Sequence, residues 1–377
     1  MHFRRLSAGA WILRCALAFA GAGLALGPSA VRADVPGLDY AGLLRSRDLT
    51  PFGFLRLDMR PAHAVAAAPG DWAVEAELAY QNTWALSRTV EKYLDRQPRH
   101  VLGSADAQAI QALPGENYLV DLELAQLDLT FHTKLTPHWG AYLVTSAASY
   151  QGGFLDSAIE SFHDAFGFTT FGRKGAARNR VNILFNLKSA QETYFGPPTR
   201  GGLLDPTLGL RYTVFEAPSR WNLVLEVATK IPVLGTRRLL STGREDTGLQ
   251  ASWQRFWERR ALFASLSAVY YRGGNDLIPT RPQLVPTLVV GIEQRITART
   301  HVILQGYSSP SVYSRRETNL DDLLKEKYQL SLGINHLKGR GLIRFAITEN
   351  LQNVNNTPDI GFQLGWAYSP AISWTGT

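Results

Sequence analysis

The sequence is poor in three things: cysteine, long apolar runs and charge of one sign. Its single cysteine, Cys15, lies in an N-terminal region of residues 1–33, so the rest of the chain can form neither a disulfide framework nor a thiolate metal site. Beyond that region no window approaches the ~18 consecutive apolar residues that a membrane-spanning helix requires. The chain must therefore take its stability from hydrogen bonding and burial.

The N-terminal region has the order of a secretory signal. Arg4 and Arg5 precede an apolar stretch at 16–27, and small residues then lead to a cleavage site expected after Ala33. The apolar stretch holds about a dozen residues, too few to cross roughly 30 Å of hydrocarbon. We predict that residues 1–33 are a signal peptide; a retained N-terminal anchor is the alternative.

The net charge is low once this region is set aside. Residues 1–33 contain no acidic residue, and removing them lowers the formal charge from +7 to +3. A charge this small, with acids and bases interleaved, does not indicate a nucleic-acid partner. The basic residues removed are Arg4, Arg5, Arg14 and Arg32.

What the sequence has in quantity is alternation with a period of two. Apolar side chains alternate with polar or small ones at 72–84, and the pattern returns at 207–214, 221–230, 328–335 and 360–368. Because successive side chains of a strand point to opposite faces, each stretch predicts a strand with one apolar and one wet face. Stretches of about ten residues favour tilted membrane-spanning strands over the ~5–6 residues of soluble ones, such as those of a β-sandwich.

The connections alternate between very short turns and long polar segments, which is typical of outer-membrane barrels with periplasmic turns and external loops. We therefore predict an all-β, antiparallel transmembrane β-barrel within residues 72–371, with both ends on the periplasmic side. The short turns are at 136–138, 217–220, 257–260, 297–299 and 337–340. The twelve predicted strands are 72–84, 118–132, 139–150, 205–216, 221–231, 247–257, 260–271, 285–296, 300–309, 327–336, 341–350 and 359–369.

One further segment has the character of a strand. Residues 180–187 alternate, yet a single extra membrane strand here would put every later short turn on the outside. We therefore assign 180–196 to a hairpin within a long outer loop, 151–204. If both arms of the hairpin entered the wall, the barrel would have fourteen strands.

The second predicted strand changes phase. Its apolar residues have even numbers within 118–124 and odd numbers within 127–131. A β-bulge near residues 125–126 would restore one apolar face. The alternative is a wall covered on both sides, for example by the N-terminal segment 34–71.

Three stretches carry a resemblance to known proteins. Residues 154–167 (FLDSAIESFHDAFG) resemble the signature loop of an uncharacterised family of predicted Gram-negative outer-membrane proteins, catalogued only as a domain of unknown function. Residues 45–52 and 201–210 fit the same resemblance, which covers most of 38–370. The last is also distantly similar to a strand start common in outer-membrane channels for fatty acids and aromatic hydrocarbons, although Leu204 stands where glycine is usual. The resemblance implies a barrel and no established activity.

The signature stretch also predicts a short amphipathic helix. With Asp156 as N-cap, helical spacing places the apolar residues of 159–166 on one face, and Glu160, His163 and Asp164 on the other. We interpret it as a loop helix folded onto the barrel mouth. Gating of the pore by these four polar residues is a second interpretation. A cation site or a hydrolytic triad around the histidine is a third.

Charged residues on the wet faces are expected to line the lumen, because a charge facing lipid at mid-membrane costs ~2–4 kcal/mol. Walls of opposite sign could create a field across a water-filled pore. Alternatively the charges pair and close the lumen, since twelve strands fall between the ~8 that side chains fill and the ~16–18 of open channels. The lumen candidates are Glu75, Glu77, Asp121, Glu123, Arg211, Glu226, Lys230, Glu293, Arg295 and Arg344.

Residues 34–71 form either a plug in the lumen or a flexible periplasmic tail. If they enter the lumen, Arg45 and Arg47 would find carboxylates at Glu75, Glu77 and Asp121. This hypothesis rests on complementary charge alone.

The expected function is a channel or transporter for small solutes, apolar ones included, in the outer membrane. A closed structural or envelope-maintenance barrel is the alternative. We predict no catalytic residue, cofactor or metal; a lipid hydrolase or acyltransferase acting through His163 is the enzyme alternative, although no Gly-x-Ser-x-Gly motif occurs. The expected partners are outer-membrane lipid, a small-molecule solute and the barrel-assembly machinery during biogenesis.

Overall fold

The computed structural model describes residues 40–47, 55–62, 69–215, 220–233, 235, 239–274, 282–352 and 354–370. The predicted signal peptide, 1–33, lies outside the described residues.

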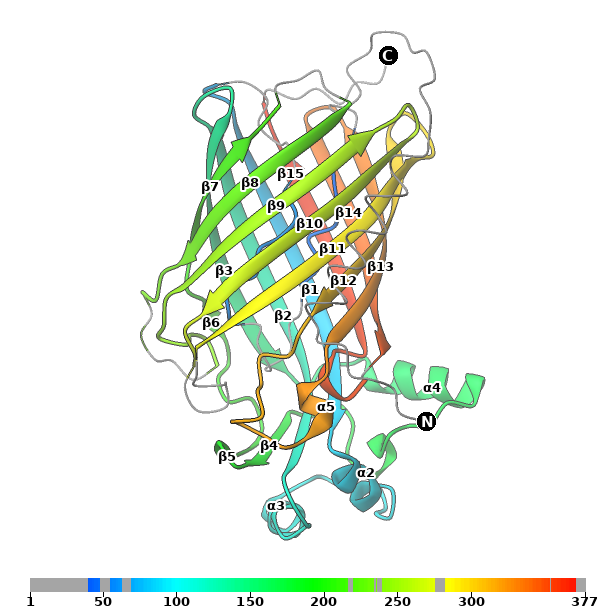
Figure 1. Ribbon diagram of the computed structural model, residues 1–377. Coiled ribbons are helices and arrows are strands. Elements are labelled where there is room, and N and C mark those ends of the chain that lie inside the picture. Colours follow the sequence, from blue (N-terminus) through cyan, green and yellow to red (C-terminus); the bar gives the residue numbers. More distant parts are fainter. Residues whose placement is uncertain are drawn as a thin grey trace, which may run out of the picture.

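Twelve antiparallel strands close into one barrel, in which each strand pairs with its neighbours and β15 returns to β1 (Figure 1). Each predicted strand overlaps one of them, so the twelve-stranded transmembrane barrel is confirmed. The wall consists of β1 Trp72–Leu86, β2 Asn117–Lys134, β3 Trp139–Gln151, β7 Thr207–Thr213, β8 Trp221–Lys230, β9 Asp246–Phe256, β10 Arg260–Tyr271, β11 Gln283–Arg295, β12 Thr300–Ser309, β13 Lys327–Lys338, β14 Gly341–Gln352 and β15 Ile360–Tyr368.

The remaining elements lie beyond one end of the wall, except β6 Gly202–Leu203, which pairs with Ala147 and Ala148 of β3. The hairpin of β4 and β5 does not enter the ring: β4 pairs only with β5 and with residues 117–121 of β2, which excludes fourteen strands. Figure 1 shows this hairpin and the helices together below the strands, on the side of the long loops. These elements are α2 Arg88–Leu94, α3 Ser104–Gln111, α4 Asp156–Phe166, η1 Arg173–Gly175, β4 Asn182–Leu187, β5 Ala190–Phe195, β6 Gly202–Leu203, α5 Asp321–Leu324 and η2 Val354–Asn356.

Alternation along the strands separates the two surfaces of the wall. In β13, Leu330, Leu332 and Ile334 are exposed on the outside, whereas Ser331 and Asn335 are buried inside. Aromatic side chains gather at the short-turn end, where Trp72 lies 6.0 Å from Tyr368 and Trp139 lies 5.0 Å from Tyr212 between ring centroids. An apolar outer band with an interfacial aromatic girdle is what a bilayer requires of such a wall.

The predicted β-bulge in the second strand is wrong. Residues 119–133 of β2 pair with β1 without a break in register, so the apolar residues of 118–124 and of 127–131 face opposite sides. The even-numbered ones, 118–124, point inward and pack against Leu55 and the loop residues Leu239 and Tyr313. The wall here is covered on both sides, because the outward-facing Leu119 packs under Leu184 of the outer loop.

No helix in the described part of the chain has both the length and the apolar character needed to cross a bilayer.

Candidate functional site

The lumen holds a piece of the chain itself. Residues 40–47 and 55–62, which we call the inner segment, lie inside the barrel and contact the inward-facing side chains of many strands. Within these residues the inner segment forms no strand pair with the wall. It is therefore held by side chains and by single hydrogen bonds rather than by a backbone ladder.

Two acids on β1 anchor a buried charge cluster. Arg45 of the inner segment donates to Glu75, with Nη2 3.1 Å from Oε1, and His132 Nε2 lies 2.6 Å from the same oxygen. Arg344 of β14 bonds Glu77 and lies 3.7 Å from Glu75. All five side chains are buried, so each charge depends on its partners for the solvation that water would otherwise supply.

A second contact places Arg47 elsewhere than predicted. Its Nη1 lies 3.1 Å from Asp128 of β2, and Arg60 Nη1 lies 3.4 Å from the same carboxylate. The sequence prediction did not name Asp128 as a partner of Arg47. An unbroken alternation after residue 125 would have put Asp128 and His132 on the inner face.

Glu293 of the wall binds the backbone of the inner segment. This β11 carboxylate accepts hydrogen bonds from the amides of Ala41 (3.2 Å) and Gly42 (2.9 Å), and lies 2.7 Å from His301 Nδ1. Residues of β11 and β12 thereby fix the start of the described segment.

Glycines on three strands make room for apolar side chains of the inner segment. A Cβ at Gly291 would lie 2.5 Å from Leu43, and one at Gly333 would lie 2.7 Å from Leu44. At Gly248 the nearest atom would be the sulfur of Met59, at 2.6 Å. The wet-face glycines of the sequence are thus contact points for the segment.

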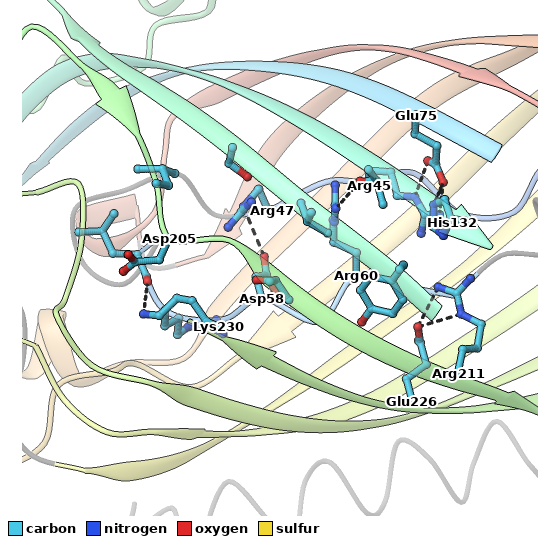
Figure 2. A pocket seen from close by; sticks show the side chains of 18 of the residues that line it. Arg45, Arg47, Asp58, Arg60, Glu75, His132, Asp205, Arg211, Glu226 and Lys230 are labelled. Atoms are coloured by element: carbon cyan, nitrogen blue, oxygen red, sulfur yellow. Dashed lines mark hydrogen bonds and ion pairs between the residues drawn. The ribbon is translucent and has the colours of Figure 1, made fainter. Parts of the chain in front are cut away.

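A polar pocket of about 60 Å³ lies between the inner segment and the wall formed by β2, β3, β7 and β8. Figure 2 shows charged side chains of the segment and of the wall meeting around it. The volume exceeds the ~10–15 Å³ that one water molecule needs, so the pocket can hold several. Its charged lining comprises Arg45, Arg47, Arg56, Asp58, Arg60, Glu75, Asp205, Arg211, Glu226 and Lys230.

The predicted lumen residues separate into groups. Glu75, Arg211, Glu226 and Lys230 meet at the pocket, where Arg211 Nη2 lies 2.8 Å from Glu226 and Lys230 Nζ lies 2.8 Å from Asp246. Inward-facing Glu77, Glu293 and Arg344 lie outside the pocket lining. Arg295, near the short-turn end of β11, bonds the carbonyl oxygen of Glu258.

Asp121 and Glu123 do not face the lumen, contrary to prediction. Both share the outward parity of Leu127 and Leu129, because β2 has no bulge. They avoid lipid because the outer loop covers them: Asp121 accepts a 2.7 Å hydrogen bond from Asn182. Their charge reflects loop attachment rather than a polar lumen.

Glu123 explains the start of the signature stretch. Its carboxylate accepts hydrogen bonds from the amides of Phe154 (3.0 Å) and Leu155 (2.7 Å), and also bonds Tyr80 and Asn82 of β1. A Cβ at Gly153 would overlap this carboxylate, at 1.8 Å, and Gly153 has a φ of 73°. Glycine is required there for close approach and for the backbone conformation.

Asp156 is not the N-cap of the helix, as was predicted; Leu155 occupies that position. The Asp156 carboxylate instead accepts from Arg173 (2.7 Å), from Asn82 of β1 (3.1 Å) and from the amide of Asn179 (2.7 Å). The residue is buried and ties the helix to both the wall and the rest of the loop.

The other three polar residues of α4 do not converge on one point. Glu160 pairs with Arg99 (2.9 Å) and Arg178 (2.5 Å), and Asp164 pairs with Lys174 (2.7 Å). His163 Nδ1 lies 2.8 Å from the carbonyl oxygen of Thr169, so a backbone carbonyl takes the place at Nδ1 that a carboxylate has in a hydrolytic triad. Within the described residues no group of three or more His, Cys, Asp or Glu could hold a metal ion.

Residues 24–369 match the family described as "Protein of unknown function (DUF3187)". The chain belongs to this family. The match confirms the resemblance seen in the sequence, and the Glu123 contacts give the signature loop of this DUF3187 protein a structural role. No curated protein matches the chain in sequence.

Solved outer-membrane proteins have similar folds. The COG4313 outer membrane channel from Pseudomonas putida F1 is 12% identical, with 83% of this chain and 100% of that chain covered and a TM-score of 0.49. The toluene transporter TodX of P. putida is 11% identical (81% and 93% covered, TM-score 0.39). The toluene transporter TbuX of Ralstonia pickettii is 10% identical (80% and 90% covered, TM-score 0.39). The likeness is one of fold alone and does not identify a solute for the DUF3187 chain.

Replacing Glu123 with Gln should release the start of the outer loop. Glutamine offers one acceptor oxygen and places its NH2 group against the donating backbone amides. Losing hydrogen bonds to a buried charged group costs about 2 kcal/mol. We expect faster hydrogen exchange at the amides of Phe154 and Leu155. The half-exposed Glu192→Gln in β5 is the matched control, and equal exchange in the two variants would contradict this role.

Acid should loosen α4 through Glu160. Burial alone would raise the pKa of this carboxyl, but hydrogen bonds from Arg178 and Arg99 lower it below its ordinary value. The pairing therefore stabilises the loop fully above the unfolded pKa of about 4.3 and is lost as pH falls through the lowered folded value. Limited proteolysis of residues 156–178 should accelerate in that window, whereas Glu160→Gln should be cleaved faster already at neutral pH. Identical neutral-pH cleavage of the two proteins would refute the assignment.

Proposed function

We propose that this chain is an outer-membrane channel for small polar solutes, closed in the present conformation by its inner segment. The observation that carries the proposal is the polar pocket between that segment and β2, β3, β7 and β8. A pocket that can hold water at this place is where a solute path through the barrel would pass. The inner segment, rather than the wall, narrows this path.

The inner segment is built to be displaced without opening the wall. Its contacts are the ion pairs of Arg45 and Arg47, hydrogen bonds such as those to Glu293, and the close packing at three glycines. None of these belongs to the backbone ladder that closes the ring between β1 and β15. Moving the segment would therefore leave all twelve strands paired.

The chemistry of the inner surface favours polar solutes over apolar ones. Glu75, Glu77, Asp128, Glu226 and Arg344 point inward from four strands of the wall, β1, β2, β8 and β14. An apolar solute passing them offers no hydrogen bond to a charge whose partner has moved, and a buried charge without a partner is costly. A polar solute can instead form hydrogen bonds with these groups.

A closed structural barrel is the second candidate, and one observation favours it. An apolar cluster that joins Leu55 of the inner segment to Tyr118, Leu122 and Tyr313 fills the lumen toward the loop side. A barrel that never opens would need no more than this packing. Conductance separates the two functions.

Location in the outer membrane is part of the same proposal. A cleaved signal peptide at 1–33, short turns in the periplasm and long loops outside would place the chain in the outer membrane, after folding by the barrel-assembly machinery. The aromatic side chains at the short-turn end support a membrane-spanning wall.

Tethering the inner segment should keep the channel shut. Ser46 Oγ lies 3.1 Å from Ser331 Oγ of β13, so the double variant Ser46→Cys/Ser331→Cys should form a disulfide when oxidised. In planar bilayers we expect the untethered protein to show stable current steps, the oxidised variant to lose them and reductant to restore them. Ser46→Cys/Ser265→Cys, whose second site is three strands away on β10, should not crosslink. An untethered protein that never conducts would support the closed barrel instead.

Crowding the inner segment should have the opposite effect. Gly248→Leu would collide with the side chain of Met59 and push residues 55–62 from the wall. We expect a several-fold rise in the fraction of time spent open. The control is Gly306→Leu, because a Cβ at Gly306 meets only Val290 at 3.7 Å. Equal open fractions in both variants would argue against a movable segment.

A further inference from the structure

Helix α4 exposes the side that helices normally bury. Phe162 and Phe166 are 52% and 65% exposed, and the flanking Phe154 and Phe168 are 66% and 55% exposed. In contrast, Asp156 and Glu160 on the opposite part of the helix are almost completely buried. A surface helix of a soluble protein shows the reverse arrangement, with its apolar stripe toward the core.

The ion pairs hold this orientation in place. Arg173 fixes Asp156, and Arg99 and Arg178 fix Glu160 one helical turn later. Rolling the helix to bury its phenylalanines would break these pairs and leave buried charges without partners. The exposed aromatic surface is therefore a stable property of the fold.

Three of the phenylalanines form one cluster. The ring centroids of Phe162 and Phe166 are 4.7 Å apart, and Phe168 lies 6.0 Å from the first and 6.1 Å from the second. Aromatic side chains carry ~150–250 Å² of surface each, so this cluster is a substantial apolar area. A contiguous patch of this kind marks an interaction with a protein or a membrane.

The position of the helix identifies the partner. Phe154, just before α4, stacks on Tyr80 of β1 with centroids 5.4 Å apart, and Tyr80 shares the outward face of β1 with Leu78. The chain that leads into α4 thus packs on the outward face of the wall. Figure 1 shows α4 running outward from the barrel at the loop-side ends of the strands.

Basic side chains lie on the polar side of the helix, away from the aromatic cluster. Lys174 and Arg178 are about half exposed, and each is tied to α4 through its ion pair. Cations beside an apolar helix face are characteristic of helices that lie in a membrane interface, where they meet anionic headgroups. Charge and apolarity therefore favour the same occupant.

We propose that α4 is an interfacial helix whose phenylalanines insert among the lipid acyl chains of the leaflet on the loop side. It anchors the outer loop to the membrane beside the barrel, while Glu123 and Asp156 anchor the same loop to the wall. The inference depends on the membrane-spanning fold and not on channel activity.

Spin labels on single cysteines test the proposal, because the chain has no cysteine beyond Cys15. Phe166→Cys and Phe162→Cys report the aromatic side. Ser157→Cys is the matched control, because Ser157 is exposed as well. It lies nine positions before residue 166 in the sequence, which places it on the opposite side of the helix. Each variant carries Cys15→Ser so that the new cysteine is its only one. It is reconstituted into phospholipid vesicles, and a heat-modifiability gel verifies that its barrel is folded.

Accessibility to oxygen and to a water-soluble nickel chelate then reports the environment of each label. We expect positions 162 and 166 to show a several-fold higher oxygen-to-nickel ratio than position 157. High nickel accessibility at all three positions would overturn the proposal in favour of a helix in water. Low accessibility to both reagents at 162 and 166 would overturn it in favour of a protein contact, such as a second copy of the chain.

Discussion

Everything in this structure depends on the closure of the backbone ladder between β1 and β15. Hydrocarbon offers no water to an unpaired N–H or C=O, so a membrane-spanning sheet is stable only when it has no free edge. The pairing of residues 74–82 with 360–368 removes that edge. Closure also gives every strand an inside and an outside, so that a sequence alternation of period two becomes a lipid-facing surface and a polar interior.

A closed polar interior creates its own requirement, which is that buried charges have partners. Glu75 and Glu77 project into the lumen from neighbouring inward positions of β1, and each would be costly to bury alone. Arg344 arrives from β14 and Arg45 from the inner segment. The segment is consequently part of the electrostatic balance of the wall. Its departure would leave Glu75 with Arg344 and His132, a smaller loss than full isolation, which is why displacement is physically reasonable.

The sequence predicted the features that are local and periodic. It did not predict side-chain positions that depend on a contact with a distant part of the chain. Twelve strands and the external hairpin at 180–196 follow from alternation and loop length, because both signals repeat along the chain. The placement of Asp121 and Glu123 does not follow from these signals. A charged residue on a membrane strand is predicted to face the lumen unless the loop that covers it is known. Arg45 was matched with Glu75 by sign, yet Arg56 and Arg60 lie in an aperiodic stretch and gave no signal. The inward apolar residues 118–124 of β2 likewise led to the prediction of a bulge, because a strand that is apolar on both faces has no single phase.

The exceptional residues of β2 follow from its length. Its 18 residues, at about 3.3 Å each, extend roughly 60 Å, well beyond a hydrocarbon layer of about 30 Å even when the strand is tilted. Near the short-turn end its inner face carries Asp128 and His132, which hold the inner segment. At the other end its outer face carries Asp121 and Glu123, where the outer loop has replaced lipid. An outward carboxylate is costly only where lipid surrounds it, so the same strand can attach a segment inside the barrel and a loop outside it. One strand therefore holds the inner segment on one face of the wall and the outer loop on the other.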